Sequence, residues 1–190
     1  MADLVFSNRK NTYITMPDGT VHWLSRACAV MAVVEIINPS NGERYVALGR
    51  RGPGTPDEQG KLGLPCGYLD WDESAFDGIR REIWEEMGLD VHDEHEWGYE
   101  PEPWSVQSEP TANRQNVTLR FAFSRNAHEF PTLSAENCEP DEVSELLWIP
   151  CMEAMNLDLA FNHQEVLKLY YKDRLKFRHS DLFNESMEKK

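Results

Sequence analysis

The stretch Gly67 to Leu89 reads GYLDWDESAFDGIRREIWEEMGL, and it decides the fold of this chain. Three of its glutamates are spaced i, i+3 and i+4 and so occupy one arc of a helix, at Glu82, Glu85 and Glu86. An apolar stripe lies beside that arc, formed by Ile79, Ile83 and Met87. The stretch therefore predicts a helix that buries the apolar stripe and holds three carboxylates at the edge of a cleft.

Both ends of the predicted helix carry residues that favour a start or a stop. Asp72 and Ser74 are both possible N-caps, and Gly88 follows the last turn, where a left-handed cap favours glycine. Upstream, residues 63–67 read GLPCG, a tight loop in which Gly67 lets the backbone approach a ligand or a metal. The sequence itself thus bounds the helix on both sides.

Three carboxylates on one helical arc repel one another and raise one another's pKa values, so the cluster favours a bound cation. Ligation by oxygen alone selects a hard ion, Mg²⁺ first and Mn²⁺ second. An ordinary acidic amphipathic helix is the alternative, and for three glutamates taken alone it is the better interpretation. The complete spacing of the stretch decides against it.

Written as spacing, the stretch is G-x5-E-x7-R-E-U-x-E-E-x-G-U, with Ile83 and Leu89 in the two bulky apolar positions U. This is the signature of the Nudix hydrolase family, which the chain resembles from about residue 26 to residue 175. At a background of about 5 to 8% per residue type, a full match arises by chance on the order of once per hundred million registers. The resemblance implies an α/β fold, namely a Nudix-type α/β/α sandwich with a mixed sheet and a loop-helix-loop catalytic motif.

The resemblance also implies roles for individual residues. The metal, Mg²⁺ or Mn²⁺ as its substitute, would be bound by Glu82, Glu85, Glu86 and the backbone carbonyl of Gly67. Arg81 and Glu73 would hold the loop and orient the glutamates by ion pairing. The metal would bridge the phosphates of the substrate while water attacks a phosphorus.

A further acidic residue outside the motif often completes the site in this family as a ligand or general base, and Glu142 is our candidate. The alternative is a solvated charge run that comprises Glu139, Asp141, Glu142 and Glu145. Many members read L-P-G-G where this chain has Leu64-Pro65-Cys66-Gly67. No histidine lies nearby in the sequence, so we interpret Cys66 as a packed side chain and not as a nucleophile.

Substrate contacts are predicted at Arg50, Arg51, Arg114 and Trp104. Arginine forks suit phosphate oxygens, and an indole can stack on a base or a sugar. Lys61 and Arg120 also lie in or near elements that could face the cleft. For each basic residue the alternative is a solvated surface charge, and for the tryptophan it is packing.

Apolar and alternating segments predict four strands, at residues 27–37, 44–50, 115–124 and 143–149. A closing helix is predicted over residues 161–177, and residues 90–114 should be loops around one or two short strands. The expected divisions are an N-terminal hairpin or arm at residues 1–25, the Nudix domain at residues 26–178 and a polar tail at residues 179–190.

The composition narrows the range of partners. With a net charge of −14 and no long basic patch, the chain is not expected to bind nucleic acid directly. The cysteines show no zinc-like spacing and no disulfide framework, and no signal peptide or membrane-spanning run is evident. A cytoplasmic location without membrane partners is therefore expected, and the arm and tail leave a homodimer open.

These observations predict a metal-dependent hydrolase that cleaves a phosphoanhydride in a nucleoside diphosphate linked to another moiety, such as ADP-ribose, a nucleotide sugar or a dinucleotide. The first alternative is a nucleoside triphosphate pyrophosphohydrolase. The second is a sensor that binds such a metabolite without cleaving it, against which the intact motif glutamates argue. The third is a prenyl diphosphate isomerase, which would pair a catalytic cysteine with a glutamate.

Overall fold

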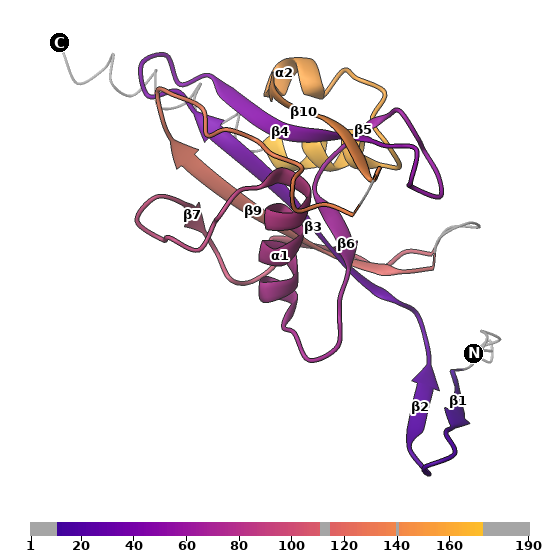
Figure 1. Ribbon diagram of the computed structural model, residues 1–190. Helices are drawn as coiled ribbons and strands as arrows, with labels where there is room; N and C mark the ends of the chain where they lie inside the picture. Colours follow the sequence, from indigo (N-terminus) through magenta and orange to yellow (C-terminus); the bar gives the residue numbers. More distant parts are fainter. Residues whose placement is uncertain (1–10, 111–114, 140, 173–190) are drawn as a thin grey trace, which may run out of the picture.

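Figure 1 shows the computed structural model, which describes residues 11–110, 115–139 and 141–172. The centre of the fold is β3 (Cys28–Ile37), a run of small and β-branched residues that is buried along almost its whole length. β3 pairs in parallel with β9 (Val117–Asn126) and antiparallel with β4 (Arg44–Arg51). The sheet is therefore mixed, as predicted.

The remaining strands extend this centre on both sides. The main path of the sheet runs β10-β4-β3-β9-β7, with β10 (Val143–Pro150) at one edge and β7 (Gly98–Tyr99) at the other. Three short strands pair outside this path: β5 (Leu62–Gly63) on β4, β6 (Cys66–Tyr68) on β3, and β8 (Ser105–Gln107) on β9. All four predicted strands are confirmed, with small shifts at their ends.

The motif forms helix α1 (Ala75–Met87), which covers one face of the sheet (Figure 1). Its apolar stripe packs on the α1-facing side chains of β3 and β9, including Val30 and Phe121. Of the two candidate N-caps, Ser74 holds the position, because its hydroxyl accepts a hydrogen bond from the Asp77 amide at 3.1 Å. Gly88 ends the helix in the left-handed conformation, with a φ of 67°. The loop-helix-loop expected for the motif is present.

A second helical segment, residues 163–172, covers the opposite face of the sheet (Figure 1). Its buried side chains, such as Leu167 and Tyr171, pack against Met31, Val33 and Leu48. The predicted closing helix is confirmed within the described residues, but it begins at residue 163 and not at 161, because Phe161 has a φ of 56°, outside the helical region. Residues 173–177 of that prediction and the tail at 179–190 lie outside the described residues.

A hairpin of two strands precedes the sheet, and a short helix follows its last strand. β1 (Thr12–Thr15) and β2 (Val21–Leu24) pair antiparallel as a hairpin that projects from the body in Figure 1. The short α2 (Cys151–Ala154), which was not predicted, directly follows β10. In the described part of the chain, no helix has the length and apolar character needed to cross a bilayer. The limits placed on the arm, the domain and the tail stay predictions.

Candidate active site

Gly67 brings the loop before the motif helix against the first glutamate of the cluster. It lies in β6 opposite Val30 of β3, and so faces α1. A Cβ at this position would lie only 2.1 Å from Oε1 of Glu82. Any other residue here would therefore displace the Glu82 carboxylate from its present position.

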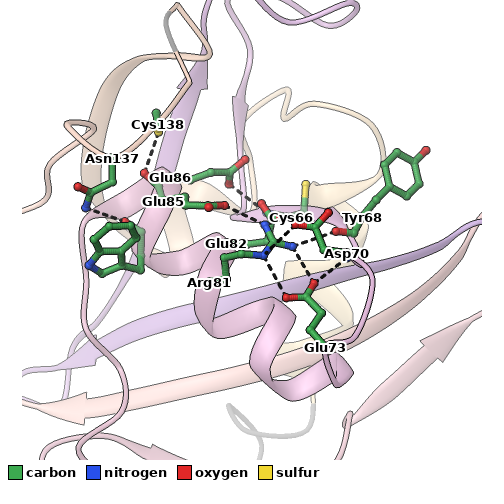
Figure 2. Close-up of polar contacts among 11 residues, drawn as sticks. Cys66, Tyr68, Asp70, Glu73, Arg81, Glu82, Glu85, Glu86, Asn137 and Cys138 are labelled. Atoms are coloured by element: carbon green, nitrogen blue, oxygen red, sulfur yellow. Dashed lines mark hydrogen bonds and ion pairs between the residues drawn. The ribbon is translucent and has the colours of Figure 1, made fainter.

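Arg81 lies at the centre of an ion-pair network, and Figure 2 shows the carboxylates arranged around its guanidinium. Its Nη1 donates to Oε1 of Glu82 at 2.9 Å and to Oε2 of Glu85 at 2.8 Å. Its Nε and Nη2 donate to Glu73, at 3.1 and 2.9 Å. Nη2 also reaches the Tyr68 carbonyl at 3.1 Å, so this single side chain ties the helix to the loop that precedes it.

Glu86 points away from that network toward the loop. Its Oε2 accepts a hydrogen bond from the Cys66 amide at 3.0 Å (Figure 2). Burial, followed by the neighbouring Glu82 charge, raises the pKa of Glu86 well above its usual range. Burial also raises the pKa of Glu82 to about 7, although Arg81 opposes the shift. The cluster thus holds more buried negative charge than its own cations neutralise.

A pocket opens beside Glu86. Its lining includes Cys66 from β6, Glu86 from α1, Arg51 from β4, Glu142 from the turn before β10, and His163 from the second helix. Burial, then the Glu139 charge, raises the pKa of Glu142. The pocket therefore brings together one motif glutamate, the acidic residue selected outside the motif, and one arginine.

The predicted substrate contacts have different surroundings. Arg51 lines the pocket, with its Nη2 3.1 Å from Asp57 and its guanidinium 4.7 Å from the centre of the Phe161 ring. Arg50 is the next residue of β4 and points to the other face, because successive side chains of a strand alternate. Its Nε bonds Glu145 at 2.7 Å and its Nη1 the Gly60 carbonyl at 2.8 Å.

Trp104 does not line that pocket, and the prediction for Arg114 is not tested. Arg114 lies outside the described residues. The Trp104 indole packs on the Tyr170 ring with centroids 5.3 Å apart, and its N–H donates to the Phe121 carbonyl at 3.1 Å. This is a packing position, which was the stated alternative for the tryptophan.

His163 is a pocket residue that the sequence analysis missed. Its Nε2 lies 4.0 Å from Sγ of Cys66, although the two residues are 97 positions apart. Its Nδ1 accepts a hydrogen bond from the Leu64 amide at 2.9 Å, so the neutral ring carries its proton on Nε2. In this state His163 points a donor at the sulfur and cannot remove a proton from the thiol. His163 lies near Cys66 in space although not in the sequence, and its tautomer supports the packed interpretation of the cysteine.

The donor set suits a hard divalent ion. Carboxylates that are buried and raise one another's pKa are relieved by a cation, and their ligands are oxygens only. In the residues that the structure describes, no three His, Cys, Asp or Glu side chains yet converge on one point. Glu82 and Glu85 are turned toward the Arg81 guanidinium, whereas Glu86 is turned toward the Cys66 amide. Glu82, Glu85, Glu86 and the Gly67 carbonyl are the groups that could hold the ion.

The comparison with protein families matches the NUDIX domain to residues 28–170. The chain therefore belongs to the Nudix family, and the class of protein is a Nudix hydrolase. A comparison with curated proteins finds no significant match.

Solved structures with the same fold share little sequence with this chain. The NUDIX domain of Shewanella oneidensis NrtR, crystallised with ADP ribose, is 19% identical with a TM-score of 0.61, covering 84% of this chain and 93% of that one. The Nudix hydrolase RenU of M. smegmatis is 18% identical with a TM-score of 0.60, covering 87% and 95%. A bifunctional NMN adenylyltransferase/ADP ribose pyrophosphatase of Francisella tularensis, complexed with AMP and a Mn ion, is 16% identical with a TM-score of 0.59, covering 78% and 42%. At these identities the likeness is one of fold.

Proposed function

We propose that this protein is a divalent-metal-dependent hydrolase that cleaves the phosphoanhydride of a nucleoside diphosphate linked to another moiety, with ADP-ribose as the first candidate. One observation carries the proposal: buried motif glutamates with raised pKa values lie beside a pocket that also holds Glu142 and Arg51. Two structural relatives were crystallised with ADP ribose or with AMP and a Mn ion, which supports the choice of substrate class and of Mg²⁺ or Mn²⁺.

In this mechanism each residue has a separate task. Glu82, Glu85, Glu86 and the Gly67 carbonyl would hold the ion, which would offset the repulsion of the diphosphate and stabilise charge on the leaving phosphate. Arg81 positions Glu82 and Glu85, and Glu73 fixes Arg81 in turn.

Glu142 and Arg51 act from the pocket itself. Because burial moves the pKa of Glu142 upward, its carboxylate becomes a better proton acceptor for the attacking water. Arg51, at the end of β4, binds a phosphate oxygen of the substrate. The products are two anionic phosphate monoesters, and the proton that Glu142 takes from the water passes to solvent before the next turnover.

The decisive experiment uses purified protein with Mg²⁺ and a panel of ADP-ribose, nucleotide sugars, dinucleoside polyphosphates and nucleoside triphosphates, with products identified in ¹⁸O water. AMP from ADP-ribose is the expected product. Pyrophosphate from a triphosphate would replace the proposal with the pyrophosphohydrolase alternative, and binding without product would replace it with the sensor.

The matched variants are Glu86→Gln and Glu94→Gln. Glutamine at 86 can still accept the Cys66 hydrogen bond, so the fold should persist while kcat/KM falls by about a thousandfold, since a metal ligand is worth several kcal/mol of transition-state stabilisation. Glu94 lies in an exposed turn, and its replacement should leave the rate unchanged. A Glu86→Gln protein with near-normal rate removes the assignment.

A cytoplasmic setting completes the proposal. No disulfide joins the cysteines in the part of the chain that the structure describes, as is usual in a reducing compartment.

A further inference from the structure

Arg120 lies on the face of the sheet that is turned away from α1. Its neighbours in β9, Leu119 and Phe121, pack with α1, so alternation along the strand directs Arg120 to the other side. Across the sheet, Arg120 pairs with Met31 of β3, and Met31 pairs with Cys66 of β6. Figure 1 shows these three strands side by side. Arg120 and the pocket residue Cys66 therefore stand in one row on the same face.

Arg120 is largely buried, with its Nε fully enclosed and no carboxylate paired with it in the described part of the chain. The residue is only 8% exposed, and its Nε has no hydrogen-bond partner. Burial alone lowers its pKa, and no salt bridge joins it to a carboxylate within the described ranges. Arg44, Arg51 and Arg125, by contrast, each pair with an acidic side chain. A buried cation without a partner is costly, so this position calls for an anion that the polypeptide does not supply.

Gln107 supplies a second, independent unsatisfied group on the same face. Ser105 and Gln107 of β8 pair with Arg120 and Thr118 of β9, so their side chains point to the same side as Arg120. The Gln107 Nε2 donates to the Glu109 carbonyl at 3.1 Å, whereas its buried Oε1 accepts no hydrogen bond. A ligand that fits both residues needs an anionic oxygen for Arg120 and a hydroxyl or amine for Gln107.

The distance to the motif glutamates allows one diphosphate to meet both groups. Neighbouring strands lie about 4.8 Å apart, so the backbones of Arg120 and Cys66, two strands apart, are separated by roughly 10 Å. The Cys66 amide in turn lies 3.0 Å from Oε2 of Glu86. A diphosphate held beside Glu86 and the Cys66 amide would therefore lie within reach of a long arginine side chain that extends over β3 from Arg120.

We propose that Arg120 is a substrate-binding residue, whose guanidinium binds a phosphate oxygen of the diphosphate while Gln107 accepts a hydrogen bond from a hydroxyl or amine of the same molecule. This inference rests on the proposed function, because that function supplies the diphosphate as the ligand. It adds a residue that the motif does not contain and that faces the substrate from the strand beyond β3.

The test measures binding of α,β-methylene-ADP, an unreactive diphosphate, by calorimetry in Mg²⁺. Arg120→Met keeps much of the apolar stem and removes the charge, so the dissociation constant should rise on the order of 10- to 100-fold. Arg120→Lys should fall between that variant and the wild type, because an ammonium replaces the fork with a point charge. The control is Arg125→Met, on the same strand but paired with Glu96, and it should bind as the wild type does.

Stability separates a binding role from a structural one. If Arg120 serves the ligand, Arg120→Met should unfold at the same temperature as the wild type or higher, because an apolar group replaces an unpaired buried charge. Binding by Arg120→Met within about twofold of the wild type would overturn the proposal, as would weak binding that only accompanies a lower unfolding temperature. Wild-type binding without hydrolysis of any substrate would sink the proposed function and leave the Arg120 result standing.

Discussion

Glu82 is a residue whose burial destabilises the metal-free protein but suits it to bind a cation. It is almost fully buried, Gly67 leaves just enough room for its carboxylate, and its main cationic neighbour is Arg81. Burial outweighs the ion pair, and the pKa rises to about 7. A group of this kind disfavours its own charged form until a ligand neutralises it.

This shift predicts the pH dependence of the metal-free protein. Since the folded state holds the Glu82 proton more tightly than the unfolded state, stability is fully present below the usual pKa of 4.5 and is lost as pH rises toward about 7. The loss should reach up to about 3 kcal/mol. Urea unfolding at a series of pH values in EDTA measures it, and Glu82→Gln should flatten the curve. Equal slopes for variant and wild type would show that Glu82 titrates normally.

Local periodicity correctly predicted which glutamates share one side of a helix, but it could not predict which arginine lines the pocket. The spacing of Glu82, Glu85 and Glu86 specified one helical arc because helix geometry depends only on neighbours in sequence. Arg50 and Arg51 are adjacent in sequence, yet only Arg51 lines the pocket. Which of them does so depends on the direction of β4 side chains within the assembled sheet, and a one-residue change in register reverses it.

Among the elements, α1 depends on its ends as well as on its buried stripe. Ser74 Oγ accepts from the Asp77 amide at 3.1 Å and donates to the Asp77 carboxylate at 2.7 Å. At the other end, the loop before β10 satisfies exposed carbonyls: Asn137 donates to Trp84, and Cys138 to Glu85 (Figure 2). This loop leads to Glu142, so the C-terminus of α1 and the acidic residue outside the motif are held together.

The N-cap of α1 gives a prediction on the scale of the element. Ser74→Ala removes the acceptor of the Asp77 amide and should lower the free energy of unfolding by about 1 kcal/mol, measured in urea. Ser74→Asn restores a capping oxygen and should recover most of the loss. An alanine variant as stable as the wild type would mean that another group caps the helix.

The closing helix shows where prediction of elements reaches its limit. Apolar spacing placed a helix near residue 161, but the structure starts it at residue 163, after a left-handed Phe161. The same start presents His163 to Cys66 and Leu64. Nothing in the local sequence indicates that meeting, because the contact forms only when the helix packs on the sheet across 97 positions.

On the scale of the whole molecule, the site is built from residues on both faces of the sheet, each of which is covered by a helix. Gly67 turns toward α1, whereas Cys66 packs on the side of the second helix, so one short strand serves both faces. The family signature predicted the sandwich, since the mixed sheet and the motif helix belong together. The sequence named Arg120 only among the basic residues that could face the cleft, whereas its burial without a carboxylate partner in the described part of the chain came from the structure.

Metal binding should stabilise the entire fold. A ligand that binds only the folded state adds about 2.7 kcal/mol when its concentration is 100 times the dissociation constant. The net charge of −14 complicates this test, because any salt relieves the self-repulsion of an acidic chain. Thermal unfolding should therefore be compared in MgCl₂ and in NaCl of equal ionic strength. We expect the unfolding temperature to rise further in MgCl₂, and Glu86→Gln to remove only that difference. Identical unfolding curves in the two salts would show that Mg²⁺ acts only by charge screening and that the glutamates bind no ion.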